Sequence, residues 1–111
     1  MLEPQHLDRI FFALADPGRR GMVEQLSRGP ASVKELARPS NMRLPSAVKH
    51  LKVLEEGGIV VSRKAGRTRT YTMHPQALAT LSEWVSERER ALNAAFDRLA
   101  RAIADLPEEG E

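Results

Sequence analysis

The chain has 111 residues, which suits one domain and leaves little room for a second, and its 41% of apolar residues support only a small core. It contains no cysteine, which excludes a disulfide framework, thiolate metal sites and a cysteine nucleophile. No stretch approaches the roughly 20 apolar residues of a membrane span, and the N-terminus lacks a signal-like apolar segment. We therefore expect a cytoplasmic protein with no membrane partner.

The net charge of +2 conceals an uneven distribution of charged residues. Residues 43–69 carry a net charge of +5, whereas residues 70–111 carry −4. A positive middle segment before an acidic end indicates one face that binds a polyanion, and a solvated surface with chance clustering is the competing interpretation.

Two helices are predicted in the first quarter of the chain. A helix over residues 4–15 is indicated by apolar residues at helical spacing, which are Leu7, Ile10, Phe11 and Leu14. Asp16 and Pro17 then suit the cap and first turn of a second helix, expected to end at Ser27. Gly18 and Gly21 each weaken that helix by up to ~1 kcal/mol relative to alanine.

A helix-turn-helix unit follows. Ser32 and Glu35 have the spacing of a capping box, which predicts a short helix that continues through Ala37. The next helix is predicted over residues 44–56 and ends at Gly57 and Gly58. Its buried face is expected to consist of Leu44, Ala47, Leu51 and Leu54.

The sequence period changes after Gly58. Residues 59–73 are predicted to form a β-hairpin with Gly66 at its tip, because β-branched and alternating segments flank a short basic turn. A long last helix is predicted over residues 75–105, with an apolar stripe formed by Leu78, Leu81, Val85, Leu92, Phe96, Leu99 and Ile103. The predicted fold is mainly α with a β-hairpin wing, in the order α-α-α-α-β-β-α. Residues 1–106 would form one winged helix-turn-helix domain, followed by an acidic tail at 107–111.

This order of elements points to duplex DNA. Two short helices joined by a tight turn can place the second in the major groove, while a hairpin reaches the backbone or minor groove. His50 is either a DNA contact or an exposed surface histidine, and the neighbouring lysines favour DNA. The candidate DNA-binding residues are Arg43, Ser46, Val48, Lys49, His50, Lys52, Arg63, Lys64, Arg67 and Arg69.

Four segments carry a family resemblance. Residues 13–20, ALADPGRR, resemble the AL-DPTRR segment of ArsR-family transcriptional regulators. Residues 44–60 resemble the recognition helix of that family and its HLKVLEEAGLV end, and Gly66-Arg67 followed by Tyr71 resembles its wing. The last helix resembles that of a subgroup without metal ligands. The match extends in order over residues 7–106.

The resemblance implies a winged-helix homodimer in which the first and last helices pair across the two-fold axis. The interface residues expected on this basis are Leu7, Ile10, Leu14, Leu81, Val85, Leu92, Phe96 and Leu99. Arg43 stands where many members have a capping serine, and Val48 stands where many have another serine. Since Val48 could contact a thymine methyl group, the operator need not match those of relatives.

The sequence contains no pattern typical of a cofactor site or an enzyme active site. The three histidines lie in separate predicted elements, and none is in the last helix, so we expect no cofactor and no metal site of the family's usual kinds. A site built from carboxylates and chain termini across a dimer is the remaining metal alternative. Trp84 is expected in the core or the dimer interface rather than in a ligand pocket between protomers. No nucleophile–base constellation indicates an enzyme.

The functional hypothesis is a homodimeric repressor that binds a pseudo-palindromic operator in double-stranded DNA. The alternative is a winged-helix module that binds another protein through its long last helix. The sequence identifies neither the inducing ligand nor the regulated genes.

Overall fold

The computed structural model describes residues 4–108, with side chains from residue 6 onward. The chain divides into two compact units, Met1–Leu81 and Ser82–Glu111. The boundary between them falls inside the last helix. The expectation that residues 1–106 act as one domain stays a prediction, and the last part of the expected acidic tail, 109–111, lies outside the described residues.

The first two helices are α1 (Pro4–Leu14) and α2 (Pro17–Leu26), close to their predicted bounds. The Asp16 carboxylate caps α2 by accepting a hydrogen bond from the backbone N–H of Arg19, at 3.0 Å. Pro17 occupies the first turn, where its missing N–H has no helical partner to lose. The predicted cap is therefore confirmed.

The helix-turn-helix comprises α3 (Val33–Ala37) and α4 (Leu44–Glu56). Both hydrogen bonds of the predicted capping box are present between Ser32 and Glu35 at the start of α3. The connecting turn includes Asn41 with a positive φ of 51°, a conformation that asparagine tolerates. The predicted burial of Leu44 is wrong: this side chain is 43% exposed, because it lies in the first turn of α4, ahead of the packed Ala47.

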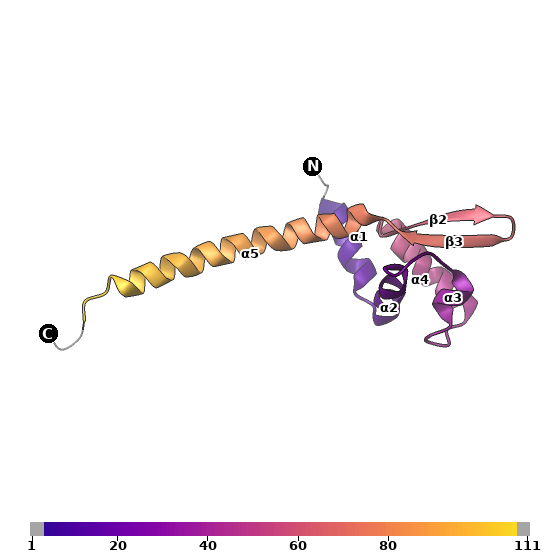
Figure 1. Cartoon of the computed structure of the whole chain (residues 1–111), viewed down its shortest axis with the longest axis horizontal. Helices are drawn as coiled ribbons and strands as arrows, with labels where there is room; N and C mark the ends of the chain where they lie inside the picture. The colour runs from indigo at the N-terminus through magenta and orange to yellow at the C-terminus, as the bar shows by residue number, and fades with distance from the viewer. Residues whose placement is uncertain (1–3, 109–111) are drawn as a thin grey trace. The chain divides into compact units, whose positions relative to one another are not determined.

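The predicted hairpin is confirmed as β2 (Val60–Ala65) and β3 (Thr68–Met73), which lie beside α3 and α4 in Figure 1. Gly66 at the hairpin turn has a φ of +63°, which glycine adopts without steric cost. A short strand that sequence reasoning missed, β1 (Ala31–Ser32), pairs antiparallel with β3. The sheet order is β1-β3-β2.

The core of the first unit joins α1, α4 and the hairpin. Its largest fully buried side chains are Ile10, Leu51, Leu54, Ile59 and Val60. Expecting Ile10 in a dimer interface was wrong, because this side chain is 0% exposed and belongs to the core cluster of its own chain. Of the predicted α1 stripe, only Ile10 is fully buried, whereas Leu7 and Leu14 are half-buried. Phe11 and Phe12 are exposed.

The last helix is α5 (Pro75–Ala104), one residue shorter than predicted. Within the second unit, every apolar residue that the helical stripe contains is substantially exposed. The most exposed are Leu92, Phe96, Leu99 and Ile103, at 54–59%. No described helix is both long and apolar enough to span a membrane.

Candidate nucleic-acid interface

Helix α4 presents a polar face opposite the one that anchors it. Ala47, Leu51 and Leu54 are fully buried, so the helix is fixed along that side. Residues between them in the helical period are exposed, as expected for Ser46, Val48, Lys49 and Lys52. Val48 is 48% exposed, which leaves its methyl groups accessible to a thymine methyl in a groove.

Arg43 occupies the N-cap position of α4 with an extended backbone. Its side chain makes no capping hydrogen bond, and the residue is exposed. The N-terminal turn of a helix carries free N–H groups and the positive end of the helix dipole. Arg43 adds a cationic side chain to this end of α4.

His50 is oriented toward the body of the first unit. Its Nδ1 lies 3.4 Å from Nη1 of Arg19 and 3.9 Å from Oδ2 of Asp16, and its side chain is 25% exposed. The histidine therefore links α4 to the junction between α1 and α2. The sequence suggested that His50 either contacts a base or is a freely exposed histidine. Neither interpretation includes its contacts with Arg19 and Asp16.

The four cationic residues of the hairpin separate onto different sides. Lys64 and Arg69 are directly opposite in the strand register and share one face of the sheet. Arg63 pairs with Thr70 and projects from the other face, whereas Arg67 follows Gly66 in the turn. The wing thus offers a charged tip and has cations on both of its faces.

Arg69 is held by a side-chain relay beneath the wing. Its Nη1 donates to Oγ of Ser62 at 2.8 Å, and that hydroxyl donates to Oε2 of Glu55 in α4 at 3.3 Å. Burial and the nearby Glu55 carboxylate raise the pKa of Tyr71, which lies opposite Ser62 in the sheet. These contacts join the wing to the recognition helix.

The remaining basic residues of this surface have no ion-pair partner within residues 4–108. The ion pairs in that range join His50 to Asp16 and Arg88 to Glu87. The unpaired exposed cations on α4 and the wing are Arg43, Lys49, Lys52, Arg63, Lys64 and Arg67. Six cations whose charges are not neutralised locally give this side of the first unit the electrostatics of a polyanion-binding surface.

Comparisons with known proteins support the same assignment. Residues 14–63 match a helix-turn-helix domain family. Over 74 residues the chain is 46% identical to the HTH-type transcriptional regulator Rv2034 of Mycobacterium tuberculosis, covering 67% of this chain and 69% of the relative. A crystal structure of an ArsR family transcriptional regulator superposes with a TM-score of 0.78 at 41% identity, covering 83% of this chain and 95% of the other.

The chain belongs to the ArsR family. Its fold is thus the winged helix-turn-helix predicted from the sequence, and it is a DNA-binding transcriptional regulator rather than an enzyme. A homodimeric winged helix-turn-helix domain from Mycobacterium bovis, a possible ArsR-family regulator, is 26% identical with a TM-score of 0.64. That similarity covers 77% of this chain and 82% of the other.

This ArsR-family regulator has structural residues in its interface region that sequence reasoning missed. Ser62 and Glu55 hold Arg69, and Arg19 reaches His50, although none of the three was predicted as part of the site. The alternation of the hairpin, which puts Ser62 on the α4 side, was the available signal. Within residues 4–108, no group of three or more His, Asp or Glu side chains is arranged to hold a metal ion.

Proposed function

We propose that this protein is a homodimeric transcriptional repressor that binds a pseudo-palindromic operator. The observation that carries the proposal is the set of unpaired exposed cations on α4 and the wing. In each protomer α4 enters the major groove and the wing tip contacts the adjoining backbone or minor groove. Two recognition helices in a dimer then contact half-sites ~34 Å apart, one helical turn of DNA.

The contacts divide into affinity and discrimination. Lys49, Lys52 and Arg67 contribute charge to phosphates, which raises affinity for any duplex. Ser46 and Val48 discriminate between bases, because one offers a hydroxyl and the other a methyl surface. His50 positions α4 through its contacts with Arg19 and Asp16 instead of reading a base.

Exposed apolar residues in both units support the homodimer. In the first unit Phe12 on α1 is 64% exposed, and Leu7 and Leu14 are half-buried. In the second unit a helix with one exposed apolar stripe needs a partner surface, and a second copy supplies an identical stripe. Of the residues expected in the interface, Leu81 is half-buried, and those with the larger exposed fractions are Val85, Leu92, Phe96 and Leu99.

The proposal is tested by titrating a labelled fragment of the DNA upstream of the protein's own coding sequence at several salt concentrations. Binding should weaken steeply with salt, and Arg67→Ala should reduce the slope of log K against log salt by about 1.8, because the dimer loses one phosphate contact in each protomer. Arg90→Ala is the matched control, because Arg90 is exposed on α5 and belongs to the second unit. Affinity insensitive to salt and to Arg67→Ala would contradict the proposal.

A second candidate function is a module that binds another protein through the exposed stripe of α5. The exposure of Leu92, Phe96 and Leu99 is the observation that favours it. Genomic selection that yields no specific DNA site, together with a stable complex with one different protein that masks this stripe, would establish it instead.

A further inference from the structure

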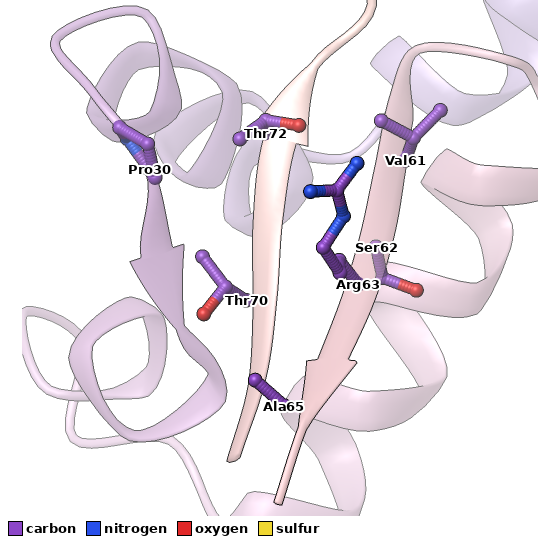
Figure 2. Close-up of a pocket in the computed structure, with 7 residues that line it drawn as sticks. All are labelled: Pro30, Val61, Ser62, Arg63, Ala65, Thr70 and Thr72. Atoms are coloured by element: carbon purple, nitrogen blue, oxygen red, sulfur yellow. The ribbon is translucent and has the colours of Figure 1, made fainter.

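The outer face of the wing sheet contains a groove that shares only Arg63 with the candidate DNA-binding residues. Its volume is about 690 Å³. The groove lies on the face that points away from the Ser62–Glu55 relay, between β1 and the hairpin strands (Figure 2). Its lining residues are Pro30, Val61, Ser62, Arg63, Ala65, Thr70 and Thr72.

The strand register gathers one cation and two hydroxyls on this face. Arg63 is directly opposite Thr70, and Val61 is directly opposite Thr72. Figure 2 shows the Arg63 side chain extending along the sheet toward the level of Thr72 and Val61. Within the described part of the chain, the Arg63 guanidinium and the hydroxyls of both threonines have no hydrogen-bond or ion-pair partner. Three donor groups on this face are therefore without a partner among the described residues.

Apolar surface adjoins these donors. Val61 is 45% exposed although it lies in a strand, and Pro30 and Ala65 complete an apolar border. A guanidinium binds a carboxylate through two parallel hydrogen bonds, and a threonine hydroxyl can donate a third. A groove of about this size suits a small organic molecule, since ligand sites span roughly 300–1,000 Å³.

We propose that this groove binds a small organic carboxylate, with the carboxylate on Arg63 and Thr72 and an apolar body against Val61 and Pro30. This assignment rests on the proposed function for its regulatory consequence. Arg63 is one of the cations available to DNA, so a bound carboxylate neutralises one positive charge of the wing. Ligand and DNA then compete for Arg63, which is the behaviour of an inducer.

Binding is tested first on the free full-length protein, by following backbone amide resonances during titration with hexanoate. Hexan-1-ol supplies the same chain without charge, and inorganic phosphate supplies charge without the chain. Saturable shifts confined to β2, β3 and the segment around Pro30 are expected, with a Kd of about 1 mM for so small a probe. Arg63→Gln should weaken binding at least about tenfold, whereas Arg67→Gln, in the hairpin turn outside the groove, should leave it unchanged.

Several outcomes overturn the assignment. They are shifts of equal size in the Arg67→Gln and Arg63→Gln proteins, shifts scattered over unrelated surfaces, or no shifts at all. Hexan-1-ol or phosphate binding as tightly as hexanoate also overturns it, because the proposal requires both the charge and the apolar body.

The second measurement separates this inference from the proposed function. At a hexanoate concentration ten times its Kd, competition should raise the apparent Kd for the upstream DNA fragment by up to about tenfold, and chloride at equal ionic strength should not. The Arg63→Gln protein should show at most about a twofold hexanoate effect. Hexanoate binding without any specific DNA binding contradicts the proposed function alone. DNA binding that hexanoate leaves unchanged contradicts the competition.

Discussion

At the scale of single residues, Arg19 shows how one side chain can connect the end of α1 to His50 of α4. Its Nε and Nη2 donate to the carbonyls of Ala13 and Phe12, at 2.7 and 2.9 Å, in the last turn of α1. The Phe12 carbonyl also accepts a hydrogen bond from the Ala15 N–H, at 3.2 Å. The guanidinium also lies 5.3 Å from the centre of the Phe12 ring. Arg20 bonds the carbonyl of Leu14. The two adjacent arginines in the ArsR-like segment therefore cap the preceding helix.

The contribution of Asp16 to stability at the junction between α1 and α2 can be tested by lowering the pH. The hydrogen bond from the Arg19 N–H, and then the positive charges nearby, lower the pKa of its carboxyl. A carboxyl with a lowered folded-state pKa stabilises the fold above its unfolded pKa, and that contribution disappears as pH falls through the folded value. Asp16→Asn keeps a capping oxygen but does not titrate. Between pH 5 and about pH 3, Tm should therefore fall further for the unmodified protein than for Asp16→Asn.

Glu35→Gln is the companion variant for that measurement. The pKa of Glu35 is also lowered, chiefly by its hydrogen bond from the Ser32 N–H. Each single variant should reduce the acid sensitivity of Tm, and the double variant should reduce it further. An equal fall of Tm in the unmodified protein, both single variants and the double variant would show that neither carboxyl causes the loss of stability in acid.

Residue identity alone did not separate DNA contacts from structural contacts. Arg69 and His50 lie at positions that charge and helical period assign to the polar surface, and that reasoning correctly placed Lys49 and Lys52 as exposed. The sequence could not show that Arg69 bonds Ser62 or that His50 meets Arg19, because both contacts join residues from different elements. Long polar side chains on one face have several partners within reach, and the packing of elements selects among them.

At the scale of elements, helix α2 contains two glycines that differ in the space available for a side chain. A Cβ at Gly21 would meet no atom within 4 Å, whereas a Cβ at Gly18 would lie 3.0 Å from Oδ2 of the capping Asp16. Gly21→Ala should raise the free energy of unfolding by about 0.5–1 kcal/mol, since alanine restricts the unfolded chain and favours the helix. Gly18→Ala should give a smaller gain or a loss. Urea denaturation of both variants checks this, and equal gains would contradict the packing argument.

The wing relay gives a prediction about Arg69. Because its guanidinium is bonded to Ser62, we expect Arg69→Gln to weaken operator binding without changing the salt slope, as for a residue that positions the wing. Ser62→Ala should have the same effect. Arg67→Gln should instead lower the slope by about 1.8, one phosphate contact for each protomer. Anisotropy titrations at several salt concentrations check all three, and a lower slope for Arg69→Gln would identify it as a phosphate contact.

The elements themselves were largely predictable. Helix bounds followed from caps and apolar period, and the hairpin followed from β-branched residues around Gly66. Strand β1 was missed because it has only two residues, and its pairing with Tyr71 and Thr70 depends on tertiary structure. Leu44 was misplaced because the helical period places a residue on a face but does not say where along the helix the packing begins.

At the scale of the whole molecule, the chain combines a packed unit with a helix that has no packed core of its own. The first unit buries side chains from α1, α4 and the hairpin around Ile10, Leu51 and Leu54. In the second unit, Leu92, Phe96 and Leu99 remain more than half exposed within one chain. An isolated helix gains little stability from propensity alone, so such a stripe is normally stabilised by tertiary or quaternary packing. The homodimer proposal supplies that packing.

Phe96→Glu tests this dependence on a second copy. A charge at the centre of an apolar interface is costly to bury, so the variant should shift the protein from dimer to monomer in sedimentation equilibrium. Asn93→Glu is the matched control, because Asn93 is exposed on the same helix outside the apolar stripe and gains the same charge. Since Phe96 is 57% exposed in the single chain, the first unit should keep its fold. Operator binding should weaken for Phe96→Glu alone, because two half-sites would no longer be bound by one linked particle. A Phe96→Glu protein that remains dimeric would place the interface elsewhere.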